Sequence, residues 1–597
     1  MNSLTRSSGI LAPLFSLPGV RDMGSLGRCA RSFADFLAAA GQRWWQTLPT
    51  NPIDSSGSPY LSSSAFAGEP LYLDLEEFRD EGLLDDGDLA DAWLLPAHIT
   101  PGDSSVPLRD ARSEEIIYRN ARARRSRCWK KAFERYARGA GGERYRREEE
   151  RFREENAYWL DDYAVFQTAV DVFSPDRPES FKRWPDPILK REPSAVKEFS
   201  REHKDALEYR RFLQLAFDVQ WKELRSYCAE RNIRLFGDAP IYVAPASADV
   251  WARRELFMVD ERLGVVREGG VPADVFNPKG QPWGSPVYRW PRHVDERFRW
   301  HVNRMKKMLE RFDLVRIDHF IGFYNYFSFP RKRIDPETGL RGDKLVPPKP
   351  QDGRVYDKGW EPGPQEAFFD AIFSECPKEA FIAEDLGVMN DGVGRLRDKY
   401  GLPGMQVFQF SFGGVTIDPA TGRAPDPIKK WRENSVGYTD THDAAPVLGW
   451  IDDIVRLGEG ARNYADFAAL TNVLDAYRRG GDKPARVPDV PSDVCPVCEF
   501  FRKPIGFKRA KLGVSKKFRP MAPATAELRM PAMRAVAESP CKLAIFPIQD
   551  AIGLSNDSCV NYPGVKKGNW TWRLADGQLT PELEAELRAL AEESGRA

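Results

Sequence analysis

FDLVRIDHF (312–320) is the most informative stretch of the sequence, because a short apolar run ends there in charged side chains. Arg316 lies within the run, and Asp318 and His319 follow it. Such a run is typical of a parallel strand that is covered on both faces. Parallel α/β barrels keep their chemistry at the carboxyl ends of the strands. The stretch therefore predicts a buried strand with candidate functional residues at its end.

A short apolar run that ends in polar residues, or is followed by Gly, Pro or a charged residue, recurs in four further stretches of the chain. They are IRLFGDAPIYV (233–243), AFIAEDLG (380–387), GMQVFQFSF (404–412) and ENSVGYTDTHD (433–443). Amphipathic helices separate the strands, as in HVNRMKKMLERF (301–312) and GVGRLRDKYG (392–401). Alternating strands and helices indicate a parallel sheet, either closed or doubly wound. With 597 residues, the chain is long enough for a (β/α)₈ TIM barrel with inserted subdomains.

The charge balance excludes a general attraction to polyanions. Lys plus Arg and Asp plus Glu both number 88, so the formal net charge is zero. The composition therefore predicts neither a nucleic-acid partner nor an anionic membrane partner. A neutral partner such as a sugar fits better, and the 16 Trp, 19 Tyr and 35 Phe suit stacking on pyranose rings. Most of these aromatic residues are nevertheless expected to fill the core.

The cysteines and the N-terminal stretch favour a cytoplasmic protein. The eight cysteines are scattered, which is typical of a reducing compartment rather than a disulfide framework. Pro13 and Pro18 interrupt the first residues, which do not resemble a signal peptide, and no run is long enough to span a bilayer. Cys495 and Cys498 form half of a zinc motif without a second half, so we expect plain thiols and no metal.

Two stretches of unusual composition lie outside this pattern. Residues 112–155 are dense in both signs of charge, and the signs interleave at helical spacing. This favours solvated helices over an RNA-binding segment. Residues 480–531 mix Gly, Pro and Lys with weak periodicity. We expect a catalytic barrel over 1–455, an insertion or loosely structured subdomain over 456–530, and a C-terminal part over 531–597 that completes the barrel.

Three strand ends carry carboxylates that suit glycoside chemistry, which needs two carboxyl groups about the anomeric carbon. Arg316 and Asp318 share one face of their strand, and a neighbouring guanidinium keeps a nucleophilic carboxylate ionised. Glu384 follows an apolar strand, where a carboxyl can hold its proton as a general acid. His442 and Asp443 end another strand and can bind sugar hydroxyls. Spacing alone leaves open the alternative of a structural ion pair and a core histidine.

A long series of motifs resembles the amylomaltases and plant disproportionating enzymes, a glycoside hydrolase family within the α-amylase clan. The resemblance covers roughly 8–455 and 530–575, whereas 460–530 is not clearly covered. The matching motifs include SGILAPLFSLPG (8–19), WWQTLPTNP (44–52), GSPYLSSSAFAGEPLYLDL (57–75), GDAPIYVAPASADVWA (237–252), GVPADVFNPKGQPWGSPVYRW (270–290), VRIDHFIGFYNYF (315–327), IAEDLGVMNDGVGRLRDKYGLPGMQVFQFSF (382–412), SVGYTDTHD (435–443), FPIQDAIGL (546–554) and NYPGVKKGNWTWRL (561–574).

The resemblance implies a 4-α-glucanotransferase without a cofactor, acting on α-1,4-glucan such as maltooligosaccharide, starch or glycogen and on an acceptor sugar. It implies Asp318 as nucleophile, Glu384 as acid/base and Asp443 as transition-state stabiliser. It implies supporting or groove-lining roles for Arg316, His319, His442, Tyr60, Asp274 and Trp283. Such an enzyme works by retaining double displacement, with its two reacting carboxyl groups about 5–5.5 Å apart.

Several positions depart from the usual motifs of that family. The departures are Leu61, Glu69, Ala273, Val275, Ser285, Ile321, Ala444, Ala445 and Pro446. Some replace a hydrogen-bonding side chain near the expected groove, which changes substrate discrimination. Two alternatives therefore stay open at this point: an α-glucan hydrolase or transferase with altered substrate, and a non-catalytic glucan-binding protein. The presence of all three carboxylates counts against the second alternative.

Overall fold

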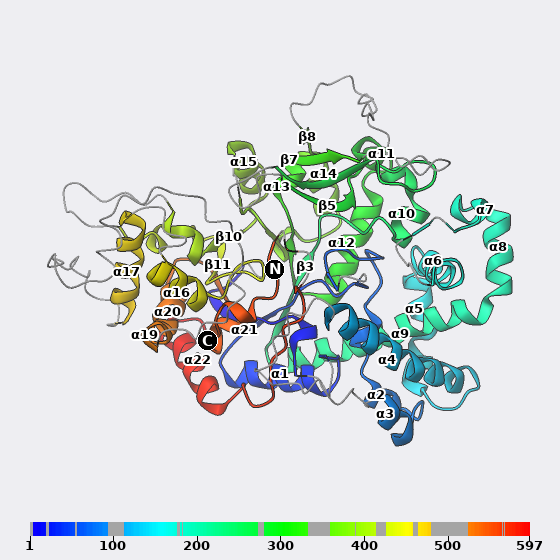
Figure 1. Cartoon of the computed structure of the whole chain (residues 1–597), viewed down its shortest axis with the longest axis horizontal. Coiled ribbons are helices and arrows are strands. Elements are labelled where there is room, and N and C mark those ends of the chain that lie inside the picture. Colours follow the sequence, from blue (N-terminus) through cyan, green and yellow to red (C-terminus); the bar gives the residue numbers. More distant parts are fainter. Residues whose placement is uncertain are drawn as a thin grey trace.

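The computed structural model describes all of the chain apart from fourteen stretches. These are 1–3, 19–22, 54–56, 93–112, 176–179, 182, 273–279, 332–358, 388–389, 414–424, 458–463, 479–522, 564 and 566–567. Figure 1 shows a central barrel with helical extensions on two sides. One extension carries α4 to α9, and the other carries α16, α17, α19 and α20.

Eight parallel strands form the barrel in the order β10-β11-β12-β1-β2-β3-β6-β9. Their bounds are β1 Ser7–Leu11, β2 Trp44–Gln46, β3 Arg234–Ala239, β6 Leu314–Ile317, β9 Phe381–Ala383, β10 Gly404–Val407, β11 Ser435–Tyr438 and β12 Leu543–Pro547. The N–H of Ala383 donates to the carbonyl of Pro403 at 2.9 Å, which joins β9 to the residue before β10. The predicted (β/α)₈ barrel is thereby confirmed.

Helices of ordinary amphipathic type connect and surround the barrel strands. They are α1 Arg28–Ala39, α9 Lys204–Glu230, α12 Arg299–Arg311, α14 Gln365–Phe373, α15 Asp391–Tyr400, α16 Val447–Leu457, α17 Tyr464–Arg478, α19 Pro523–Ala526, α20 Arg529–Ala537, α21 Ile548–Ala551 and α22 Pro581–Glu593. Local sequence explains their ends. In α15 the Asn390 side chain accepts from the N–H of Val393, and Gly401 ends the helix with φ of 65°.

Insertions between the barrel strands enlarge the barrel and cover its rim. The helical insertion between β2 and β3 holds α2 Leu75–Asp80, α3 Asp86–Ala92, α4 Ser113–Ala137, α5 Glu143–Glu155, α6 Leu160–Phe173, α7 Asp186–Leu189 and α8 Pro193–Glu202. The helices α4 and α5 confirm the helical interpretation of 112–155. The later insertions hold α10 Ala248–Ala252, α11 Trp290–Asp295, α13 Ile321–Tyr324 and an antiparallel sheet of β4 Arg267–Val271, β5 Gln281–Pro286, β7 Asn325–Pro330 and β8 Trp360–Pro362.

The expected boundaries of the C-terminal region stay a prediction. Most of 480–531, including Cys495 and Cys498, lies outside the described residues. On the described part, β12 pairs with both β11 and β1 and so contributes an inner strand of the barrel. Within that part, none of the helices is long and apolar enough to cross a membrane. The six cysteines in it form no disulfide bond.

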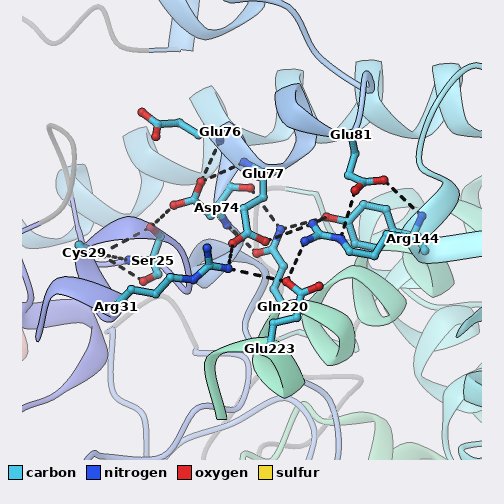
Figure 2. A network of polar contacts seen from close by, with 11 residues as sticks. Ser25, Cys29, Arg31, Asp74, Glu76, Glu77, Glu81, Arg144, Gln220 and Glu223 are labelled. Atoms are coloured by element: carbon cyan, nitrogen blue, oxygen red, sulfur yellow. Dashed lines mark hydrogen bonds and ion pairs between the residues drawn. The ribbon is translucent and has the colours of Figure 1, made fainter. Parts of the chain in front are cut away.

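A partly buried ionic network attaches the first helical insertion to barrel helix α1 (Figure 2). Arg144, at the start of α5, donates to Glu77 of α2 at 3.1 Å and to Glu223 of α9 at 2.7 Å. Arg31 of α1 donates to the other oxygen of Glu77 at 2.7 Å. The side chain of Asp74 accepts from two N–H groups in the first turn of α2. Arg144 thus links three helices through two carboxylates.

We expect Arg144→Met to destabilise the protein, because it leaves Glu77 and Glu223 facing each other with less positive charge. The Arg144 side chain is only 25% exposed, so solvent replaces little of the lost attraction. The expected loss in the free energy of unfolding is about 2 kcal/mol, read from urea unfolding followed by circular dichroism. Arg79→Met is the control, because the partners of Arg79 lie at the surface. Equal unfolding midpoints for the two variants would contradict the proposed contribution.

Candidate active site

The register of the barrel strands brings the predicted site residues together. Asp238 of β3 lies opposite Arg316 of β6, and Ile317 of β6 lies opposite Ala383 of β9. Because these strands are parallel, the residues that follow them, Asp318 and Glu384, leave the barrel at the same end. The N–H of Glu384 donates to the carbonyl of Ile317 at 3.0 Å and continues the ladder to this point.

Arg316 contacts three carboxylates at the barrel mouth. Its Nη1 lies 2.9 Å from Asp318 Oδ1 and 2.7 Å from Asp238 Oδ2. Its Nη2 lies 3.9 Å from Glu384 Oε2. The guanidinium is almost fully buried, so its charge is weakly screened and reaches all three groups. The predicted neighbourhood of Arg316 and Asp318 is therefore seen directly in the structure.

Glu384 is buried and held by backbone donors. Its Oε2 accepts from the N–H of His319 at 2.8 Å, and its Oε1 accepts from the N–H of Leu386 at 2.9 Å. Burial raises the pKa of Glu384 to about 8, outweighing the attraction of Arg316 and these two hydrogen bonds. Glu384 can therefore hold a proton at neutral pH, as a general acid must.

His319 has an unusual backbone conformation that serves the contact with Glu384. Its φ is 50°, in the left-handed region, which costs a non-glycine residue about 1–2 kcal/mol. This conformation directs its N–H at the carboxyl of Glu384. Burial lowers the pKa of His319, so its ring is uncharged at neutral pH. The ring lies edge to face against Trp283, with centroids 5.0 Å apart.

The pKa of Asp443 is shifted in the opposite direction to that of Glu384. Its Oδ2 lies 3.2 Å from His442 Nε2, and its Oδ1 accepts from Asn561 Nδ2 at 2.6 Å. Desolvation alone would raise its pKa, but the charge of His442 and the hydrogen bonds from His442 and Asn561 outweigh it and lower the pKa to about 2. Its side chain is still 41% exposed and stays ionised where a ligand can reach it.

Tyr60 ties these groups into one polar network. Its hydroxyl donates to Asp238 Oδ2 at 2.7 Å and lies 2.8 Å from His442 Nε2. The Tyr60 ring stacks on the ring of His442, with centroids 5.3 Å apart, and Trp570 packs against both. The structure therefore brings eight of the nine predicted site residues together at the barrel mouth, whereas Asp274 lies outside the described residues.

Two members of the network were not predicted from the sequence. Asp238 follows the same apolar pattern as Asp318 and could have been found at its strand end. Only the register shows that it faces Arg316. Asn561 comes from an irregular segment after β12, where no pattern signals its contact with Asp443.

The departures from the usual motifs occupy different environments. Glu69 is fully buried and has a structural role. Its carboxylate accepts from the N–H groups of Ile53 at 2.8 Å and Leu71 at 2.9 Å. It also pairs with Arg122 at 3.2 Å. Ser285 and Ile321 are also buried. Ala273 and Val275 lie outside the described residues. Within the described chain, no group of three His, Cys, Asp or Glu side chains is arranged to hold a metal ion.

Comparisons with known proteins agree with the geometry. The family model of the 4-alpha-glucanotransferases matches residues 12–580. The 4-alpha-glucanotransferase of Thermus thermophilus is 34% identical over 99% of both chains, and that of Aquifex aeolicus is 32% identical over 96% of both. The amylomaltase of Streptococcus agalactiae, solved in complex with acarbose, superposes with a TM-score of 0.75 at 27% identity, covering 99% of this chain and 100% of that one. The chain belongs to the 4-alpha-glucanotransferase family, whose members are enzymes of glucan transglycosylation.

Proposed function

We propose that transfer proceeds by two displacements, with Asp318 as nucleophile, Glu384 as acid/base and Asp443 as stabiliser of the transition state. One observation carries this assignment: Glu384 has a pKa raised to about 8, while Asp318 is paired at 2.9 Å with the buried Arg316. Two carboxyl groups in such different environments, both in reach of one guanidinium, suit the opposite tasks of proton donor and anionic nucleophile.

The first displacement would break the donor glucan. Asp318 attacks C1 of the donor sugar, the bond from C1 to the bridging oxygen breaks, and Glu384 protonates that oxygen as it leaves. The products are a shortened glucan, a glycosyl ester of Asp318 and an ionised Glu384. Asp443, ionised and exposed, would bind the sugar hydroxyls and offset the positive charge that develops on the ring.

The second displacement would rebuild the linkage on an acceptor. The 4-hydroxyl of an incoming sugar attacks C1, Glu384 takes its proton, and the carboxylate of Asp318 is released. We propose an α-1,4-glucan as donor, and glucose or a second glucan as acceptor. The Streptococcus agalactiae relative was solved in complex with acarbose, which supports an oligosaccharide as substrate. Six further side chains would bind and orient the sugar residues: Tyr60, Asp274, Trp283, Arg316, His319 and His442.

Maltotriose is the simplest test of this function. Incubation with the protein is expected to give glucose together with a ladder of longer maltooligosaccharides, separated by chromatography and counted by mass. The reason is that a sugar acceptor, held against the aromatic side chains of the site, competes with water for the glycosyl ester.

The same incubation with the Asp318→Asn variant is the negative control. Glucose and maltose without longer products would contradict transfer and favour hydrolysis. Unchanged maltotriose at high protein concentration, with binding intact by calorimetry, would contradict catalysis on this substrate.

A further inference from the structure

A second pair of buried carboxyl groups lies beside the reacting groups, at the carboxyl ends of the neighbouring strands β11 and β12. Asp440 follows β11 and is 2% exposed, and Asp550 of α21 is fully buried. The two carboxyl groups are hydrogen-bonded to each other. Neither belongs to the set that contacts Arg316, and the proposed mechanism uses neither.

Asp550 holds both ends of the loop that carries Asp443. Its Oδ2 accepts from the hydroxyl of Thr439, at the start of the loop 439–447. Its Oδ1 accepts from the N–H of Val447 at 2.7 Å, where the loop ends and α16 begins. One carboxyl group thus spans the base of the loop, and His442 and Asp443 lie between the two anchored residues.

Further contacts hold the middle of the loop, among them Asn561, which donates to Asp443 at 2.6 Å. Gln409 donates to the carbonyl of Ala445 at 2.5 Å, and the Cys559 thiol donates to the carbonyl of Ala444 at 3.1 Å. Both act on backbone after Asp443. Before Asp443, the carbonyl of His442 accepts from the N–H of Asn561 at 3.1 Å, and the loop backbone reaches His442 from Asp440 through Thr441.

A small cavity lies beside Asp440, and its described lining includes no lysine or arginine. Asp440 lines a small cavity together with Thr441, His442, Gln549 and Cys559 and with apolar groups from β1 and β12. Of these, His442 and Cys559 are titratable, and His442 pairs with Asp443. No lysine or arginine lines this cavity among the residues that the structure describes. Oδ1 of Asp440 has no hydrogen-bond partner in the described structure.

Two carboxylates in contact without a cation cannot both be ionised at moderate cost, so they share a proton. Burial, and then the charge of Asp550, raise the pKa of Asp440 well above its usual range. Burial raises the pKa of Asp550 to about 6, although it accepts hydrogen bonds from Thr439, Val447 and Asp440. The shared proton therefore lies on Asp440, which donates to an ionised Asp550. Asp550 in turn accepts from both ends of the loop.

We propose that Asp440 and Asp550 are positioning residues, a proton-sharing pair of carboxyl groups that sets the place of Asp443 by fixing the loop 439–447. The inference rests on the proposed role of Asp443 in transition-state stabilisation. It assigns the pair to the chemical step rather than to substrate affinity, because a displaced Asp443 weakens a contact that is strongest in the transition state.

The test compares Asp440→Ala with the isosteric Asp440→Asn, whose amide can still donate to Asp550. Asp440→Ala is expected to lower kcat for maltotriose transfer about tenfold with KM within about twofold of the original. Asp440→Asn is expected to keep at least about half of kcat, because it replaces the shared proton by an N–H. Asp576→Asn, at the exposed turn before α22, is the control and leaves kcat unchanged.

A double-mutant cycle with Asp443→Asn separates positioning from general damage. In that background, measured with α-maltosyl fluoride as an activated donor, Asp440→Ala is expected to lower kcat less than about twofold. An equal loss in both backgrounds, an Asn variant as damaged as the Ala variant, or an unchanged Ala variant would overturn the proposal.

Two further measurements keep the outcomes distinct. If Asp440→Ala does not fold, as judged by circular dichroism, Thr439→Val removes one anchor of the loop instead and carries the same expectations. If Asp443→Asn alone leaves kcat unchanged, the proposed role of Asp443 fails. That result is separate from any result on Asp440.

Discussion

Asp318→Asn is expected to lower kcat for maltotriose disproportionation by at least about 10⁴-fold, since loss of a nucleophile removes the covalent route altogether. The amide cannot form the glycosyl ester, and no other carboxylate replaces it. Asp238 is committed to Tyr60 and Arg316, and Glu384 is held by two backbone N–H groups. Activity is measured as glucose release at saturating maltotriose.

The fold should survive this substitution. Arg316 keeps its contact with Asp238 at 2.7 Å, so its buried charge is not left without a partner. Asp295→Asn, a change at an exposed carboxylate of α11, is the control and should retain full activity. A 5-fluoroglycosyl fluoride should label the unchanged protein at Asp318, detected by the mass of a peptic peptide. Label on another carboxylate, or near-normal turnover by Asp318→Asn, would contradict the assignment.

Five of the eight barrel strands were predictable because each is a short apolar run followed by polar residues, Gly, Pro or a charged residue. The other three were not identified as strands. The strand β2 has only Trp44–Gln46, which is too short to show a period. The strands β1 and β12 pair with each other from opposite ends of the sequence, Ser7 with Leu543. Closure of the barrel depends on this long-range pairing, which no local pattern contains.

The site was predictable to the extent that its residues lie at strand ends. Asp318, Glu384 and Asp443 could be named from the sequence because each follows an apolar run. Their electrostatic roles could not be read there, because the raised pKa of Glu384 and the lowered pKa of Asp443 depend on burial and on partners from distant segments. Asn561 lies 118 residues from Asp443 in the chain and still donates to it at 2.6 Å.

A distant partner also explains how the structure accommodates one of the departures from the usual motifs. Glu69 departs from the usual motif, yet its carboxylate is buried and paired with Arg122 of α4, so the helical insertion supplies its partner. A segment outside the motif thus supplies the partner that this departure from the motif needs. Ser285 and Ile321 are both buried, and they are the departures at which substrate preference should be examined next.

Glu384→Gln is expected to have a second large effect that depends on the leaving group. With maltotriose, whose departing oxygen needs a proton, kcat should fall by about 10⁴-fold, the upper range for loss of a general acid. With α-maltosyl fluoride, which leaves without protonation, formation of the glycosyl ester should fall by less than about 10²-fold. Added azide should then give an α-maltosyl azide, because it attacks C1 without needing a base.

The pH dependence provides an independent check on the same carboxyl group. The acid must be protonated in the free enzyme, and its pKa is raised to about 8. Therefore kcat/KM for maltotriose should be steady below that pH and fall as the pH rises through it. The fall should be absent for Glu384→Gln acting on the fluoride. Glu379→Gln, an exposed position just before β9, should keep both the rate and the pH profile of the unchanged protein. An equal loss with both donors would show that Glu384 acts on something other than the leaving group, and the acid/base assignment would then be wrong.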